Sequence, residues 1–268
     1  MRVSGGSVGD FENVSQCYLR NMPYETDAGI SARAALGLIV LASDQTIEYE
    51  FRRVTALPGI GVYESRIYNA PEVTPDTLIA LEKEITQGAG LILPGIPVDV
   101  IAFGCNSGTM IIGEDVVYEK IRAARPGVPC TSPVAGTMAA FERLGVSRVA
   151  VLTPYSDAVN LFVADFLRQR GLDVVAFGSF NEKNDHKVAR TSLDSIGRAM
   201  VTLGRIDGVE VVLACCTSLR LVDQIAEIEK ELGKPVTSSN HAMGWHALRL
   251  AGIRDTMPEF GRLFELSL

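Results

Sequence analysis

The chain has 268 residues, of which 47% are hydrophobic, and it carries a formal net charge of −7 at pH 7. This composition excludes a disordered chain, and the acidic balance argues against nucleic acid or an anionic membrane as a partner, because phosphates and acidic lipids would not attract it. No apolar run approaches the roughly 20 residues of a membrane-spanning helix, and the N-terminus lacks the basic start and apolar stretch of a signal peptide. We therefore expect a cytoplasmic protein with a small-molecule ligand.

Short apolar runs rich in β-branched residues alternate with amphipathic stretches, which is typical of parallel strands joined by crossover helices. The predicted strands are residues 37–42, 99–104, 148–153, 173–178 and 209–214. The clearest helix covers residues 157–170, between an N-cap at Ser156 and a stop at Gly171. The apolar face of a later helix is formed by Leu221, Ile225, Ile228 and Leu232. The pattern predicts an α/β protein.

An internal repeat relates the two halves of the chain. GLIVLASD is echoed by RVAVLTPY, and DVIAFGCNSGT is echoed by VEVVLACCTSL. Asp44 and Cys105 are 61 positions apart (105 − 44), and so are Tyr155 and Cys216 (216 − 155), which gives an offset of 111 residues between the halves.

Further along, Arg143 matches Arg249 at an offset of 106, so one small indel separates the repeats. We predict two pseudo-symmetric α/β lobes, each a parallel sheet flanked by helices, with the active site in the cleft between them. The first lobe is expected to comprise residues 1–136 plus 241–268 and the second residues 137–240.

Two of the five cysteines follow matching strands, Cys105 after residues 99–104 and Cys216 after residues 209–214. Ligands of open parallel sheets bind beyond the carboxyl ends of the strands, so both thiols are expected to face the cleft. A small polar pair follows each cysteine before a helix begins, and these four candidate substrate-binding residues are Asn106, Ser107, Thr217 and Ser218. Backbone N–H groups there would lower the thiol pKa and cradle a carboxylate.

The remaining cysteines are interpreted as packing or surface thiols. The repeat register selects Cys216 over Cys215, and Cys215 then points to the opposite face of its strand, into a core. Cys130 and Cys17 receive the same packing or surface interpretation. The odd number of cysteines and the absence of C-x-x-C spacing indicate neither a disulfide framework nor a zinc knuckle.

No metal and no cofactor is predicted. His241 and His246 are five positions apart and would not share a helix face as metal ligands do at i, i+4. His241 has two interpretations, a residue that lines the cleft or a hydrogen-bonded structural histidine, and the second is favoured. The glycine-containing PGIGVYES, residues 58–65, lacks a phosphate-binding lysine and is interpreted as a flexible turn.

The segments GCNSGT, VLTPY and the run from CCTSLRLVDQ to HAMGWHALRLAG resemble the aspartate/glutamate racemase superfamily. Within it, they are most similar to the branch that holds maleate cis–trans isomerase, arylmalonate decarboxylase and the ectoine-utilisation protein A. The resemblance covers roughly residues 35 to 253. It implies a cofactor-independent, homo-oligomeric enzyme, a dimer or tetramer. It also implies one catalytic residue from each lobe on opposite faces of the substrate, and Cys105 and Cys216 fall on those positions.

Two thiols favour an isomerase or racemase acting on a small carboxylate substrate. In a racemase, one thiolate removes the α-proton and the opposite thiol delivers another; in a maleate-type isomerase, one thiolate adds to the double bond. The sequence leaves these open. The resemblance makes decarboxylation the weaker alternative, because arylmalonate decarboxylases use one thiol and carry glycine where this chain has Cys105. A non-catalytic small-molecule-binding protein is a further alternative.

The resemblance adds three candidate substrate-binding residues. Asp44 stands where maleate isomerases have asparagine; it would repel a carboxylate and suit an ammonium or amide N–H, although it could instead cap the following helix. LIVLASDQTIEYEFR, which contains it, looks like the ectoine-utilisation branch. Tyr155 falls where the family binds a substrate carboxylate with a tyrosine hydroxyl. Asn184 sits roughly where maleate isomerases have a second binding asparagine, and Arg190 or His186 could equally take an anion there.

Overall fold

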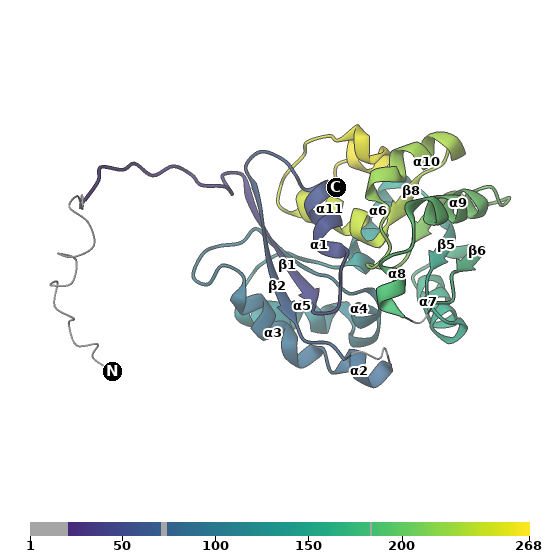
Figure 1. Cartoon of the computed structure of the whole chain (residues 1–268), viewed down its shortest axis with the longest axis horizontal. Coiled ribbons are helices and arrows are strands. Elements are labelled where there is room, and N and C mark those ends of the chain that lie inside the picture. Colours follow the sequence, from purple (N-terminus) through teal and green to yellow (C-terminus); the bar gives the residue numbers. More distant parts are fainter. Residues whose placement is uncertain (1–20, 71–73, 183) are drawn as a thin grey trace.

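The computed structural model describes residues 21–70, 74–182 and 184–268, and Cys17 lies outside them. Eight strands of this part form two four-stranded parallel sheets, ordered β2-β1-β3-β4 and β6-β5-β7-β8. In Figure 1, the first sheet, with β1 and β2, lies to the left of the second sheet, with β5 and β6. The predicted two-lobed α/β fold is confirmed.

The strands are β1 (Ala34–Leu41), β2 (Ile60–Ile67), β3 (Val100–Phe103), β4 (Cys130–Thr131), β5 (Arg148–Thr153), β6 (Asp173–Ser179), β7 (Val211–Ala214) and β8 (Val236–Ser238). The α-helices are α1 (Ile47–Val54), α2 (Pro75–Ile79), α3 (Glu82–Leu91), α4 (Asn106–Ile112), α5 (Glu114–Ala124), α6 (Pro133–Leu144), α7 (Asp157–Gln169), α8 (Asp185–Val188), α9 (Leu193–Gly204), α10 (Ile225–Leu232) and α11 (Ser239–Leu250). Three short 3₁₀ helices are η1 (Val222–Gln224), η2 (Pro258–Phe260) and η3 (Arg262–Glu265).

The internal repeat reappears in the element positions. β7 begins 111 residues after β3 (211 − 100), and α11 begins 106 residues after α6 (239 − 133), as the sequence offsets predict. The two sheets also have the same strand order, with the second strand of each lobe at the edge. Equivalent strand ends therefore lie at equivalent places in the two lobes.

The five predicted strands correspond to β1, β3, β5, β6 and β7, but the interpretation of residues 58–65 as a flexible turn is wrong. Gly59 makes the turn, with a φ of 78°, and β2 then pairs with β1 along its whole length. This edge strand lacks the apolar pattern by which strands are predicted, because Glu64 and Arg66 form ion pairs with α1 residues instead of facing a core.

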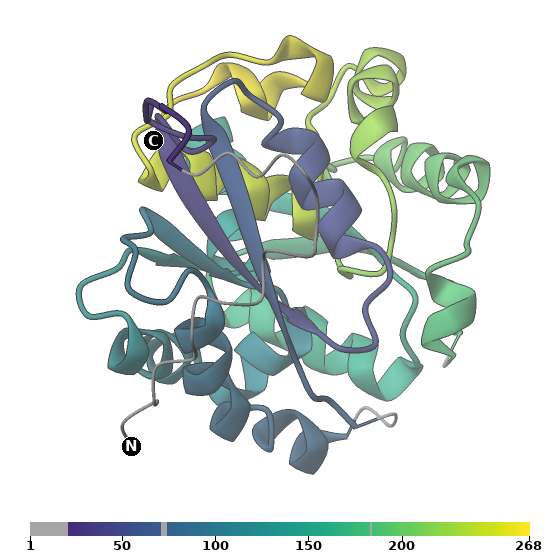
Figure 2. The same cartoon turned by 60° about the vertical axis from the view of Figure 1, so that its left-hand side comes forward.

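The helices after β4 and β8 cross to the opposite lobe. Phe141 of α6 packs in a core cluster with Val149 of the second sheet, whereas Trp245 of α11 packs with Leu36 of the first. A Cβ on Gly136 would lie 2.7 Å from the Ala242 carbonyl, so the close approach of α6 and α11 requires glycine there. Figure 2 shows the C-terminal segment, in yellow, beside the first sheet. The exact division into lobes remains a prediction.

The predicted helix from residue 157 is α7, which ends at Gln169, just before Gly171. Ser156 occupies its N-cap position but makes no side-chain capping bond. The predicted apolar face from Leu221 packs in the second lobe's core, although α10 begins only at Ile225, after one 3₁₀ turn. Within the described segments, no helix combines the length and apolarity needed to cross a bilayer. The cytoplasmic location and the dimeric or tetrameric state remain predictions.

Candidate active site

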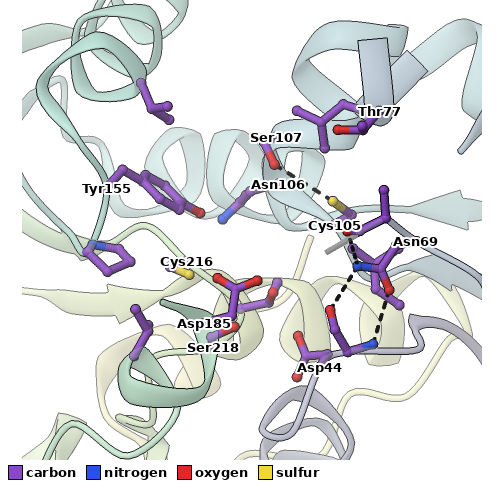
Figure 3. Close-up of a pocket in the computed structure, with 18 of the residues that line it drawn as sticks. Asp44, Asn69, Thr77, Cys105, Asn106, Ser107, Tyr155, Asp185, Cys216 and Ser218 are labelled. Atoms are coloured by element: carbon purple, nitrogen blue, oxygen red, sulfur yellow. Dashed lines mark hydrogen bonds between the residues drawn. The ribbon is translucent and has the colours of Figure 1, made fainter. Parts of the chain in front are cut away.

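A cavity of about 530 Å³ lies at the carboxyl ends of both sheets and takes its walls from both lobes. The segments after β1, β3, β5 and β7 supply most of the predicted site residues, as expected for parallel sheets. The predicted residues that line the cavity are Asp44, Cys105, Asn106, Ser107, Tyr155, Cys216, Thr217 and Ser218. Figure 3 shows Cys105 and Cys216 on opposite sides of this space.

Cys105 occupies the N-cap position of α4, and its buried Sγ accepts the backbone N–H of Gly108 at 3.2 Å. The Ser107 hydroxyl lies 3.9 Å from the same sulfur. The Thr109 hydroxyl donates to the Cys105 carbonyl, which ties the residue to its own helix. Burial nevertheless raises the pKa of the Cys105 thiol to about 11.

Cys216 follows β7 without an α-helix directly behind it, because residues 217–219 form a turn and a bend before η1 begins at Val222. The Tyr155 hydroxyl and the backbone N–H of Ser218 both act to lower the pKa of this buried thiol. Burial raises the pKa of Cys216 to about 12. The expectation that helix N-termini lower both thiol pKa values is therefore wrong, since desolvation outweighs the N–H donors in both lobes.

Three carboxylates line the cavity, those of Asp44, Glu182 and Asp185, whereas no lysine, arginine or histidine of the described chain does. Glu182 pairs with Lys187 at 3.6 Å. Neither Asp44 nor Asp185 forms an ion pair with any residue that the structure describes. Burial is the main cause that raises the pKa of Asp185, and the charge of Asp44 is the second. The charges of Asp44 and Asp185 also raise the pKa values of Cys105 and Cys216.

Asp44 caps α1 and also lines the cavity. Its Oδ1 accepts the backbone N–H groups of Thr46 and Ile47, at 2.7 and 2.8 Å, and so caps α1. Its residue exposure is only 6%, yet it lines the cavity. Arg66 is held by Glu48 and by the main-chain carbonyl of Asp44, so its contact is with the backbone and not the carboxylate.

Asn184 does not line the cavity. Its side chain caps α8 by accepting the Lys187 backbone N–H at 3.1 Å, and the next residue, Asp185, lines the cavity instead. His186 bonds to the Gln45 amide at 2.7 Å and is not part of the lining either.

Other lining residues were missed from the sequence, among them Asn69, which follows β2 and bonds to Ser43. Because β2 was not recognised, its end gave no signal. A strand predicted at residues 60–67 would have pointed to Asn69, because ligands of parallel sheets bind beyond the carboxyl ends of the strands.

Cys130, Cys215 and His241 are buried and do not line the cavity. Cys215 and Cys216 belong to different core clusters, as the alternation of strand faces predicts, and Cys130 is buried in the first lobe's core. His241 is buried and bonds to the Thr237 hydroxyl and the Phe260 carbonyl, which confirms the structural interpretation. Within the described segments, no group of three histidine, cysteine or acidic side chains is arranged to hold a metal ion.

The fold and the site define a class of two-lobed α/β proteins in which each lobe presents a buried thiol to one shared cavity. Residues 113–264 match the protein-family model described as arylmalonate decarboxylase. The chain belongs to the arylmalonate decarboxylase family, and the resemblance found in the sequence is confirmed.

Three similar proteins illustrate the relationship. The arylmalonate decarboxylase of Bordetella bronchiseptica is 37% identical over 146 residues, which are 53% of this chain and 60% of that protein. A maleate isomerase of Pseudomonas putida is 23% identical over 241 residues, 85% of this chain and 96% of that protein. The solved Nocardia farcinica maleate cis-trans isomerase mutant with a covalently bound succinylcysteine intermediate has a TM-score of 0.79 at 22% identity, covering 87% and 98% of the two chains.

Proposed function

We propose that this protein is a cofactor-independent isomerase in which Cys105 and Cys216 act on a small carboxylate from opposite sides. The observation that carries the proposal is the position of both thiols in the wall of one cavity, each supplied by a different lobe. The maleate isomerase relatives and the succinylcysteine in one of them support cysteine chemistry of this kind. The Cys105 sulfur also accepts the backbone N–H of Gly108, and the backbone N–H of Ser218 acts to lower the pKa of Cys216; both effects favour the thiolate.

In the racemase form of the proposal, one cysteine is a thiolate and the other a thiol. The thiolate takes the α-proton, and the electron pair of the broken C–H bond moves into the substrate carboxyl group. The opposite thiol then delivers its proton to the other face of the carbon, so the two sulfurs exchange protonation states and the charge is unchanged. Thiols on opposite sides of one cavity suit this transfer.

The carboxylate group of the substrate would bind at the strand ends that carry the two cysteines. Ser107, Thr217 and Ser218 line this part of the cavity and supply hydroxyl and backbone N–H donors. Asn106 is fixed there because its amide donates to the Ser239 hydroxyl. These donors are neutral, and no basic side chain of the described residues joins them in the lining.

The charges of the cavity favour a substrate that also carries an ammonium group. Asp44 and Asp185 would repel the second carboxylate of maleate, whereas they would attract a protonated amine. An ammonium between them would also offset two charges that raise the pKa of both thiols, so substrate binding would favour thiolate formation. We therefore propose racemisation of an amino acid or amino-acid derivative, which agrees with the resemblance to the ectoine-utilisation branch.

Deuterium exchange tests this function. The protein would be incubated in D₂O with amino acids, N-acetylated diamino acids and maleate, and the α-proton and alkene signals followed by NMR. Exchange at an α-carbon with loss of optical purity is expected for an amino-bearing substrate. Conversion of maleate without any α-exchange would contradict racemisation and leave the cis–trans isomerase form of the proposal.

Decarboxylation is the second candidate, because the arylmalonate decarboxylase of Bordetella bronchiseptica shares 37% identity with the matched part of this chain. The resemblance implies that such a decarboxylase needs only the second-lobe thiol. Replacing Cys105 with glycine separates the two functions, since an isomerase would lose activity and a decarboxylase would keep it. Release of carbon dioxide from an arylmalonate by Cys105→Gly would favour this second candidate.

A further inference from the structure

Glu50, on α1 of the first lobe, is a buried carboxylate that the proposed chemistry does not use. Only 1% of the residue is exposed. Its Oε1 accepts the backbone N–H groups of Leu221 and Val222, the second at 2.9 Å, and its Oε2 accepts the side-chain amide of Asn240 at 2.9 Å. A side chain of the first lobe therefore binds main chain of the second lobe, 171 positions away in the sequence.

The main chain that Glu50 binds belongs to the Cys216 loop, defined here as residues 216–222. The same loop is held at two further points. The Thr46 hydroxyl, at the start of α1, donates to the Ser218 carbonyl at 3.2 Å, and Asn240 donates to the Thr217 carbonyl at 2.8 Å. Most polar main-chain contacts of the loop therefore end on α1 or on the residue that Glu50 itself binds.

The matching segment of the first lobe is held differently. Cys105 is followed at once by α4, and the contacts of its sulfur and carbonyl come from Gly108 and Thr109 of that helix. Cys216 has no α-helix behind it until Ile225. The Cys216 loop consequently depends on the opposite lobe for restraints that Cys105 obtains from its own helix.

No basic side chain pairs with Glu50 among the residues that the structure describes. The charged group that acts on it is Asp223 of η1, whose carboxylate is itself bound by Arg53 and Tyr49 of α1. Burial raises the pKa of Glu50 to about 7, and its three N–H donors work against that rise. A buried carboxylate without a cation is stabilised by such donors alone, so the geometry of the Cys216 loop and that of Glu50 depend on each other.

We propose that Glu50 is a positioning residue that holds the Cys216 loop against the first lobe and thereby sets where Cys216 lies relative to Cys105. The inference rests on the proposed function only in taking Cys216 as a reacting group. The contacts themselves predict that Glu50 restrains the loop, whether or not the protein turns over a substrate.

The test compares iodoacetamide labelling of Cys216 with that of Cys105 in the intact protein, measured by peptide mass spectrometry at constant pH. Glu50→Gln removes the charge and places an amide donor against Asn240. At pH 8, above the pKa of about 7, Glu50 is ionised in the wild type. Loss of one hydrogen bond to this charged group favours local opening of the loop, so the ratio of Cys216 to Cys105 labelling should rise by on the order of tenfold. Cys105 serves as the internal reference.

Glu229→Gln is the matched control. Glu229 is also buried, and its carboxylate accepts the backbone N–H groups of Val236 and Arg262, away from the Cys216 loop. This variant should lose stability in thermal unfolding while the labelling ratio stays at the wild-type value. An equal rise of the ratio in both variants would show general loosening and overturn the proposal.

Thr46→Val keeps the test decisive if Glu50→Gln does not fold. Valine has nearly the shape of threonine but removes the hydroxyl that donates to Ser218, so a smaller rise of the same ratio is expected. A wild-type ratio in the folded loop variants would overturn the positioning role. A raised ratio without any isomerase activity would instead leave the positioning role standing and count against the proposed function.

Discussion

The Cys105 and Cys216 segments occupy equivalent strand ends in a repeated fold, yet they are built differently. Cys105 is the N-cap of a helix and takes its restraints from α4. Cys216 precedes turns and a 3₁₀ helix and takes its restraints from Glu50 and Thr46 of the other lobe. The repeat thus provides two thiols at one cavity, while the different segments behind them make the thiols inequivalent.

The inequivalence extends to the hydroxyl groups beside the two sulfurs. The Ser107 hydroxyl, two positions after Cys105, lies 3.9 Å from the Cys105 sulfur, whereas the hydroxyl that lowers the pKa of Cys216 belongs to Tyr155, after β5. Burial, followed by the neighbouring Cys216, raises the pKa of Tyr155 well above its usual range, so this hydroxyl stays a donor. Proton transfer at both faces of a substrate requires one acid–base group on each face. The two groups, here the proposed thiols, do not need identical surroundings.

The largest expected effect comes from removing either sulfur. Cys105→Ser and Cys216→Ser should each lower the racemase or isomerase activity by about 10²–10⁴-fold, the usual contribution of a positioned acid or base. Cys215→Ser and Cys130→Ser, in the cores, are the controls. Steady-state kinetics would measure the effect. Retention of activity by one of the two cavity variants would break the comparison and indicate a single-thiol reaction.

The next effect concerns stability and Glu50. Its pKa is raised from 4.5 to about 7, so the folded protein keeps a proton that the unfolded chain releases. The stability that this group contributes is present below pH 4.5 and is lost as the pH rises to about 7, by about 3 kcal/mol. Urea unfolding of wild type and Glu50→Gln should show a difference in free energy that changes with pH in this window.

The comparison with Glu50→Gln is needed because His241 and His246 act in the opposite direction. Burial lowers the pKa of each to about 4, so their contribution grows as the pH rises from 4 toward 6.5. Both histidines remain in the variant, and subtraction removes their effect. A difference that is independent of pH would contradict the raised pKa of Glu50.

A smaller effect is expected from Asp44→Asn. The asparagine oxygen can still cap α1, but the charge that raises the pKa of both thiols is gone. Labelling of Cys105 and Cys216 at neutral pH should rise together by roughly tenfold, the change in thiolate fraction for one pKa unit. Asp194→Asn, on α9 and outside the cavity, is the control. Unchanged labelling would argue against electrostatic contact between Asp44 and the thiols.

The smallest effect sharpens the difference between the two thiols. Tyr155→Phe removes the hydroxyl that favours the Cys216 thiolate and leaves the contacts of Cys105 intact. Labelling of Cys216 should fall by about fivefold with no change at Cys105, as expected for one hydrogen bond of about 1 kcal/mol. An equal fall at both cysteines would contradict the assignment of Tyr155 to the second-lobe thiol.

The sequence predicted those site residues that directly follow apolar strands. Cys105 and Cys216 were found because each follows an apolar strand and the repeat offset matches the two strand ends. Asp44 and Tyr155 were added by the resemblance to the family. Asn69 was missed because β2 is a polar edge strand whose charges pair with α1. Asn184 was proposed from the resemblance to maleate isomerases, and the four-residue helix α8 gives no periodicity that would point to Asp185.

Two features depend on tertiary packing and could not be read from local sequence. The thiol pKa values rise because burial opposes the N–H donors, and burial is known only once the two lobes close around the cysteines. Glu50 lies on an amphipathic helix, where a glutamate would normally be solvated. Its partners, Leu221 and Val222, belong to the other lobe, so no spacing pattern in the sequence could predict these hydrogen bonds.

The most direct test of the central claim is a crosslink between the two cavity thiols. The folded protein would be treated with 1,3-dibromoacetone, a small reagent that alkylates two sulfurs, and digested for peptide mass spectrometry. Two thiols that face one small ligand predict a linked peptide pair containing Cys105 and Cys216, and a substrate-like carboxylate should suppress it. Single alkylation of each cysteine without any linked pair would contradict the account.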